Sequence, residues 1–190
     1  MEESIYWADA RLTSWRKWLY NILTRFRHYG KFRGHIKGDK YFWGDFCREK
    51  IKYLRNFTFQ NINTLKACPF MPYHDPLKPY VNRWFASSDG HDLAAFNRCL
   101  AEENQDRLEA EGGMCIMYTH FAKGFCSNGE VNSRFRELML RLSKKNGWFV
   151  PVATLLDRLL QVNGSHSITD VERRRIEQKW LLEKIFAGPT

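Results

Sequence analysis

His120 stands where acid–base chemistry is common in α/β proteins. Gly112-Gly113 is followed by Met114–Tyr118, an unbroken apolar run that predicts a strand buried on both faces. Thr119 and His120 come next, and sites in open sheets and barrels usually lie at the carboxyl ends of strands. An imidazole titrates near neutral pH, so it can protonate a leaving group. His120 is therefore the leading catalytic candidate. The alternative is a histidine that only hydrogen-bonds across the strand end.

The other reactive side chains lack the spacing of a metal or nucleophile site. No two of the six histidines are four residues apart, and the five cysteines include no Cys-x-x-Cys pair. His74 and Asp75 are adjacent, so hydrogen bonds that fix a loop are favoured over metal ligation. Cys126 lies six residues beyond His120, but nothing in that spacing demands a thiol–imidazole pair. We expect no metal site in this chain and mostly free thiols in a reducing compartment.

Alternating short strands and helices are expected to position His120. The segment Ala122–Glu130 contains turn residues and predicts a loop, and Ser88 or Asp89 is expected to cap the helix before Met114. Thr169 and Glu172 form a capping box for a last helix. Strands are expected at Phe57–Gln60, Arg83–Ala86, Met114–Tyr118 and Trp148–Val150, and helices at Asp45–Leu54, His91–Glu111, Val131–Lys145, 151–160 and from Thr169 to about Phe186.

A resemblance to a known family is carried by short pieces in a fixed order. These pieces are Tyr118-Thr119-His120-Phe121, Gly124-Phe125, Arg141-Leu142, Gly147-Trp148-Phe149-Val150-Pro151-Val152 and Leu155-Leu156-Asp157. In this order they resemble the carboxyl-terminal portion of polysaccharide deacetylase-like proteins, the NodB-type carbohydrate esterases. The resemblance extends over Pro69–Leu160 and is weakest before Asp89.

The resemblance implies a fold and a role for particular residues. The fold is α/β, a helix-rich and incomplete (β/α) barrel-like domain. His120 would lie near the substrate and protonate the departing amine when an N-acetyl sugar is deacetylated. Tyr118, Phe121, Trp148 and Trp84 are then the candidates for substrate contacts.

The chain departs from the family in its metal motifs. The family binds its metal through a Thr-Phe-Asp-Asp-like motif and a His-x-x-x-His pair, and neither occurs here. We therefore expect a partial form that is inactive alone and holds no cofactor. A divalent metal such as zinc would come with the missing segment, carried by a second chain. A truncated reading frame, a split gene product and a degenerate relative remain open, and so does the oligomeric state.

The amino-terminal arm, residues 1–60, carries most of the net charge of +9. It holds thirteen Lys or Arg against six Asp or Glu, whereas residues 61–190 hold seventeen against fifteen. Ser4–Tyr29 predicts a long amphipathic helix, with basic residues flanking an apolar stripe. That helix packs on the domain or, alternatively, associates with an anionic membrane surface or with nucleic acid. The start lacks the pattern of a secretory signal peptide, so we expect a cytoplasmic protein, with membrane association as the alternative.

Two domains and three classes of function follow from these patterns. Residues 1–60 form the basic helical arm and loop, and residues 61–190 form the deacetylase-like α/β portion. The first function is deacetylation of a glycan, which requires the missing segment. The second is a non-enzymatic module that binds carbohydrate or protein. The third is a basic protein that associates weakly with a membrane surface or nucleic acid.

Overall fold

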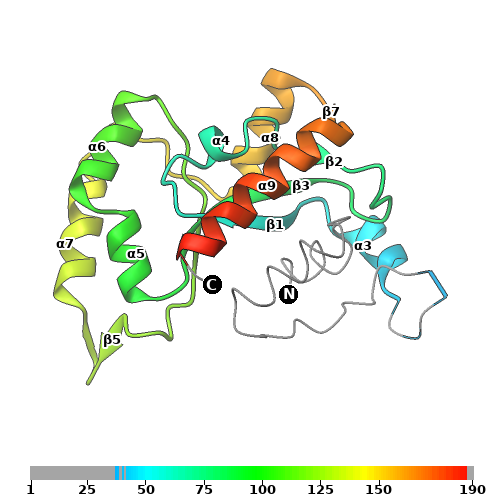
Figure 1. Ribbon diagram of the computed structural model, residues 1–190. Coiled ribbons are helices and arrows are strands. Elements are labelled where there is room, and N and C mark those ends of the chain that lie inside the picture. The colour runs from blue at the N-terminus through cyan, green and yellow to red at the C-terminus, as the bar shows by residue number, and fades with distance from the viewer. Residues whose placement is uncertain (1–36, 39, 41, 188–190) are drawn as a thin grey trace. The chain divides into compact units, whose positions relative to one another are not determined.

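The computed structural model describes residues 37–38, 40 and 42–187 (Figure 1). This described part contains seven helices and seven strands, so the predicted α/β class is confirmed. Its sheet is partly parallel and does not close into a barrel within the described residues. The helix expected at Ser4–Tyr29 lies outside those residues. None of the helices in the described part is long and apolar enough to cross a membrane.

Five strands make one sheet in the order β1-β3-β2-β7, with β4 paired to β3. The pairs β3–β4 and β2–β7 are parallel, and β2–β3 is antiparallel. The remaining two strands form a separate antiparallel hairpin. The strands are β1 Leu54–Phe59, β2 Tyr73–His74, β3 Trp84–Gly90, β4 Met117–Thr119, β5 Cys126–Ser127, β6 Glu130–Val131 and β7 His166–Ser167.

The helices occupy most of the remaining described chain. The capping box predicted at the start of the last helix is confirmed, because Glu172 accepts hydrogen bonds from the backbone and hydroxyl of Thr169. The helices are α3 Gly44–Lys50, α4 Thr64–Ala67, α5 Leu93–Cys99, α6 Glu102–Ala110, α7 Ser133–Leu142, α8 Val152–Asn163 and α9 Asp170–Ala187.

The chain folds into two compact units, and each is discontinuous in sequence. Of the described residues, unit 1 takes in those up to 57, then 70–85 and 156–187, and unit 2 takes in 58–69 and 86–155. The chain passes between the units within β1, between α4 and β2, within β3 and within α8. Unit 2 contains the strand end that bears His120, so its construction decides the candidate site.

A buried chain of hydrogen bonds joins α4, β3 and β4 in unit 2. The backbone N–H of Ile116 donates to Thr64 Oγ1 over 2.9 Å, and the Thr64 and Ser88 hydroxyls lie 2.7 Å apart. The Ser88 hydroxyl donates onward to the carbonyl of Asn61. Thr64 and Ser88 are fully buried, so these groups have no water to replace a lost partner. The network therefore fixes where β3 and β4 meet.

Gly90 lets β3 and β4 approach each other closely at their carboxyl ends. A Cβ atom at this position would lie 2.6 Å from the Met117 sulfur and 3.1 Å from the Tyr118 carbonyl oxygen. A larger residue here would therefore displace the Met117 side chain and crowd the backbone of β4. The close approach holds the segments that follow the two strands near each other.

An aromatic cluster supports these strands in unit 2. The rings of Phe96, Phe125 and Phe135 meet edge to face, with centroids between 5.1 and 5.3 Å apart. These residues come from α5, the segment after β4 and α7. Such pairs add to the free energy gained from burial alone. The cluster thus anchors the chain on both sides of the β4 end, together with Ile62, Cys99 and Leu100.

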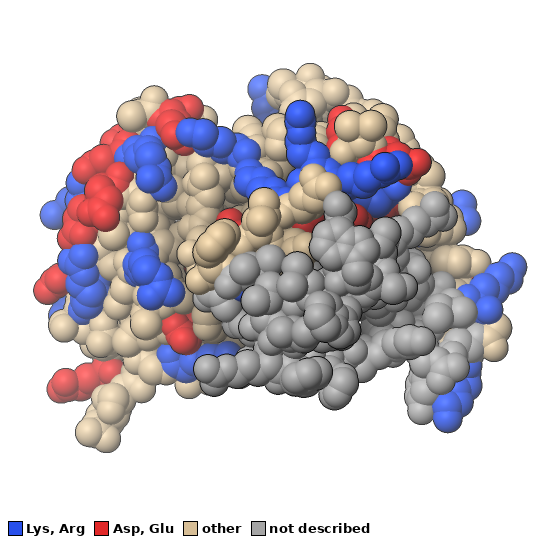
Figure 2. All heavy atoms as spheres, viewed as in Figure 1, with Lys and Arg blue, Asp and Glu red and all other residues tan. Residues whose placement is uncertain are grey.

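Ion pairs on the surface join α6 to α7, which lie side by side in Figure 1. Arg134 bonds Glu102 through two contacts of 2.6 Å and lowers the pKa of that carboxyl to about 2. Arg141 and Lys145 both reach Asp106. Figure 2 shows the resulting mixture of basic and acidic side chains over these helices at the left. Exposed pairs contribute little to stability, so the aromatic cluster remains the main support.

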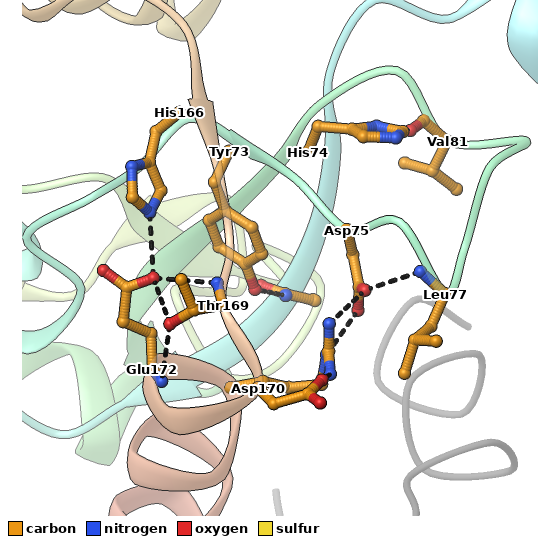
Figure 3. Close-up of polar contacts among 11 residues, drawn as sticks. Tyr73, His74, Asp75, Leu77, Val81, His166, Thr169, Asp170 and Glu172 are labelled. Atoms are coloured by element: carbon orange, nitrogen blue, oxygen red, sulfur yellow. Dashed lines mark hydrogen bonds and ion pairs between the residues drawn. The ribbon is translucent and has the colours of Figure 1, made fainter.

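A buried ion pair in unit 1 joins Asp75, the residue after β2, to Arg173 of α9. Arg173 donates to both oxygens of Asp75, at 2.9 and 3.1 Å, and Asp75 also accepts from the backbone of Leu77 (Figure 3). His74 contacts the Val81 carbonyl at 3.2 Å. His74 and Asp75 therefore fix their loop by hydrogen bonds, as the sequence favoured.

Several predicted elements have other bounds in the structure, and two predictions differ more deeply. The helix expected at His91–Glu111 breaks between α5 and α6, because Ala101 is extended and the Gln105 side chain bonds the Leu100 carbonyl. The strand expected at Trp148–Val150 does not form. Trp148 and Phe149 are exposed, and the described residues offer this segment no neighbouring strand.

The hydrogen-bond chain in unit 2 predicts the effect of replacing Thr64. Thr64→Val keeps the shape but leaves the Ile116 N–H buried without an acceptor, which should cost about 1–3 kcal/mol in unfolding free energy. Urea denaturation measures this cost. Thr64→Ser keeps the hydroxyl and is the matched control. Equal stability of the two variants would contradict the structural role of the hydroxyl.

The ion pair in unit 1 gives a second stability prediction. Asp75→Ala leaves the buried guanidinium of Arg173 without its main partner and should cost about 3–5 kcal/mol. Asp170→Asn is the control, because Asp170 contacts the same guanidinium from an exposed position. Thermal unfolding of both variants tests the difference, and a similar small shift in each would rule out a central role for Asp75.

Candidate functional site: the ends of β3 and β4

The carboxyl end of β4 presents His120 as predicted, although the strand begins later than expected. β4 spans only Met117–Thr119, and all three residues are half-buried, so the prediction of a strand buried on both faces at Met114–Tyr118 is wrong. Ile116, just before the strand, is buried. His120 is exposed, and its Nε2 atom is hydrogen-bonded to the Tyr118 hydroxyl. The two rings meet edge to face with centroids 4.9 Å apart. Tyr118 therefore orients the imidazole while Nδ1 remains available to a ligand.

The carboxyl end of β3 carries a second histidine that the sequence did not single out. His91 Nδ1 lies 2.9 Å from Asp89 Oδ1, and the Asp89 side chain is only 4% exposed. The backbone N–H of His91 contacts the same oxygen at 3.2 Å. On its other side, His91 Nε2 lies 3.4 Å from Asp92 Oδ2. The buried Asp89 carboxylate thus contacts both the backbone N–H and the ring of His91.

The register of the strands places these two groups together. In the parallel pair, Asp89 lies opposite Tyr118 and Gly90 opposite Thr119. Residues paired across strands point to the same face of a sheet. The side-chain contacts Asp89–His91 and Tyr118–His120 therefore lie on the same face of the sheet, at the ends of the two strands.

The segments after the strands are also tied to each other. The backbone N–H of Leu93 donates to the Lys123 carbonyl over 3.1 Å, and Lys123 N–H in turn donates to the His120 carbonyl. Asp92 caps α5 by accepting from the Ala95 N–H, and this hydrogen bond lowers the pKa of the Asp92 carboxyl, with smaller contributions from nearby charges that include Lys123. Asp92 is the helix cap, whereas Ser88 and Asp89, the expected caps, have other partners.

Two thiols lie near the same strands but are not activated. Burial raises the pKa of the Cys115 thiol to about 11, and burial also raises the pKa of Cys99. A thiol that stays protonated is a poor nucleophile. Cys126 is exposed within the β5–β6 hairpin. The imidazoles are therefore the better candidates for chemistry.

The predicted substrate contacts fall in different places. Phe121 is 63% exposed and packs edge-on against Phe125, and Trp148 is 61% exposed, so both offer a free ring face in unit 2. Tyr118 is half-buried and bonded to His120. Trp84 belongs to unit 1 and is fully buried, so as placed it offers no face to a ligand.

No group of three His, Cys, Asp or Glu side chains in the described part of the chain is placed to hold a metal ion. The described residues therefore do not fit a metal site of their own. What they provide is a pair of oriented imidazoles, a carboxylate partner and an exposed aromatic ring. That set can move protons and can stack on a sugar ring.

Comparisons with known proteins add no relative to this picture. No family model matches the chain, and no curated protein or solved structure matches it. The resemblance to polysaccharide deacetylases therefore stays a prediction from the sequence motifs around His120 and Trp148.

Proposed function

We propose that unit 2 supplies the proton-donating part of a site that removes N-acetyl groups from a glycan. The observation that carries the proposal is the exposed His120 at the end of parallel β4, oriented by Tyr118. The family resemblance assigns the same histidine the role of acid. The metal-bearing part of such a site belongs to a segment with the Asp and His-x-x-x-His motifs that this chain lacks.

The arrangement of His120 suits proton donation to an amine. In the imidazolium form, Nε2–H donates to the Tyr118 hydroxyl oxygen, and Nδ1–H is left to face a substrate. As the amide C–N bond breaks, that proton passes to the departing nitrogen, which leaves as the free amine. Tyr118 acts as a positioning residue, because its bond fixes the direction of the ring.

The surroundings of His120 favour a carbohydrate. Phe121 follows it directly and exposes most of its ring, while its edge contact with Phe125 holds the ring in place. Aromatic faces of this kind stack on pyranose rings. Trp148 is a second exposed ring in the same unit.

The connection from β3 to β4 supports an incomplete barrel as the parent fold. Two parallel neighbouring strands joined through α5 and α6 form a β-α-β crossover, which is the repeating element of (β/α) barrels. Sites in such barrels lie at the carboxyl ends of the strands. His120 and His91 both occupy that end.

A non-enzymatic module that binds carbohydrate or protein is the second candidate. The observation that favours it is the exposure of Trp148 and Phe149 on consecutive positions, because exposed aromatic residues often mark binding surfaces. Such a module would bind glycan without any requirement for His120.

Replacing His120 separates the two functions. His120→Ala should change the unfolding free energy by less than about 0.5 kcal/mol, because the side chain is exposed. Mixed with a chain that carries the metal motifs, the wild-type protein should deacetylate N-acetylchitotetraose, and His120→Ala should abolish release of acetate. The chain alone should release none, with or without zinc.

Two controls make this result decisive. Phe121→Ala should weaken binding of N-acetylchitotetraose in calorimetry, whereas Phe46→Ala, which removes an equally exposed ring in unit 1, should not. Acetate release that persists in His120→Ala would contradict the proton-donor role. A large loss of stability in that variant would instead make His120 structural.

A further inference from the structure

The site contains a second imidazole whose orientation is fixed more firmly than that of His120. His91 Nδ1 is 2.9 Å from Asp89, and the Asp89 carboxylate is almost fully buried. Because this oxygen accepts from the ring, neutral His91 carries its proton on Nδ1 and leaves a lone pair on Nε2. His91 is 27% exposed, so water can reach the ring.

The second carboxylate near His91, that of Asp92, is not hydrogen-bonded to Nε2. Asp92 Oδ2 is 3.4 Å from Nε2, beyond the usual N–H···O distance. The other Asp92 oxygen accepts from Ala95 as the cap of α5. When Nε2 takes a proton, the imidazolium faces a carboxylate at each ring nitrogen.

We propose that His91 is the general base of the same site, with Asp89 as its positioning residue. Asp89 lies opposite Tyr118 in the β3–β4 register, so the Asp89–His91 and Tyr118–His120 couples share one face. One face of two neighbouring strands then carries a proton acceptor and a proton donor. The choice of an amide substrate rests on the proposed function.

In the proposed site, which also needs the segment that bears the metal motifs, the two couples supply the proton transfers of the hydrolysis. Water forms a bond to the acyl carbon while its proton passes to His91 Nε2. The C–N bond breaks while the proton on His120 Nδ1 passes to the nitrogen, which leaves as the amine. The products are a carboxylic acid and an amine, and exchange of one proton with solvent returns both imidazoles to their starting forms.

An activated ester tests His91 separately from the proposed function. In 4-nitrophenyl acetate the leaving group departs as an anion, so hydrolysis needs a base but no acid and no second chain. The chain alone should hydrolyse this ester faster than an equal concentration of free imidazole. His91→Gln should lower the rate about a hundredfold, the low end of what a positioned base contributes.

Matched variants test whether the lower rate of ester hydrolysis comes from His91 itself, from the loss of any histidine or from a loss of folding. His166 also contacts a carboxylate, that of Glu172, but lies in unit 1, so His166→Gln should leave the rate unchanged (Figure 3). Asp89→Asn should lower the rate and shift the ¹⁵N resonances of His91 away from the Nδ1–H form.

The outcomes distinguish the two proposals. Unchanged ester hydrolysis in His91→Gln, an equal loss in His166→Gln, or no wild-type rate above free imidazole would overturn the role of His91. The two proposals can also separate. If His91→Gln loses ester hydrolysis while His120→Ala still releases acetate fully in the reconstituted mixture, the role of His91 is upheld and the proposed proton donor is rejected.

Discussion

The hydrogen-bond chain from Ile116 through Thr64 to Ser88 is the constraint on which unit 2 depends. It joins a short helix to two neighbouring segments through hydroxyls that are fully buried, so each hydroxyl depends on the partners that the fold gives it. With those strands held, Gly90 allows them to meet closely. The register at their carboxyl ends follows, and the register decides which side chains share a face.

The chemistry of the site arises from that register more than from any single residue. His120 by itself is an exposed histidine with a tyrosine partner, and His91 by itself is a histidine beside a buried aspartate. Parallel pairing of β3 and β4 brings these two histidines, each with its own hydrogen-bond partner, to neighbouring strand ends. A site for acid–base chemistry needs groups of this kind with different partners, so that each has its own role in proton transfer.

Sequence patterns pointed to one histidine of the proposed site and passed over the other. An apolar run followed by Thr119-His120 marked a strand end correctly, but apolar character cannot show whether a neighbouring strand exists, so Trp148–Val150 was misread. Asp89 and His91 were missed because Asp89 was interpreted as a helix cap. Their spacing of two residues at the end of a strand was the available signal. The register that sets them beside Tyr118 depends on long-range pairing, which local patterns do not encode.

The central claim is that His91 and His120 belong to one ligand site, and histidine ring NMR tests it most directly. During titration of the chain with N-acetylchitotetraose, the ring resonances of His91 and His120 should shift together with a single apparent affinity. Those of His166, which lies in unit 1, should stay in place. Shifts of only one of the two strand-end histidines, or equal shifts of His166, would contradict a shared site.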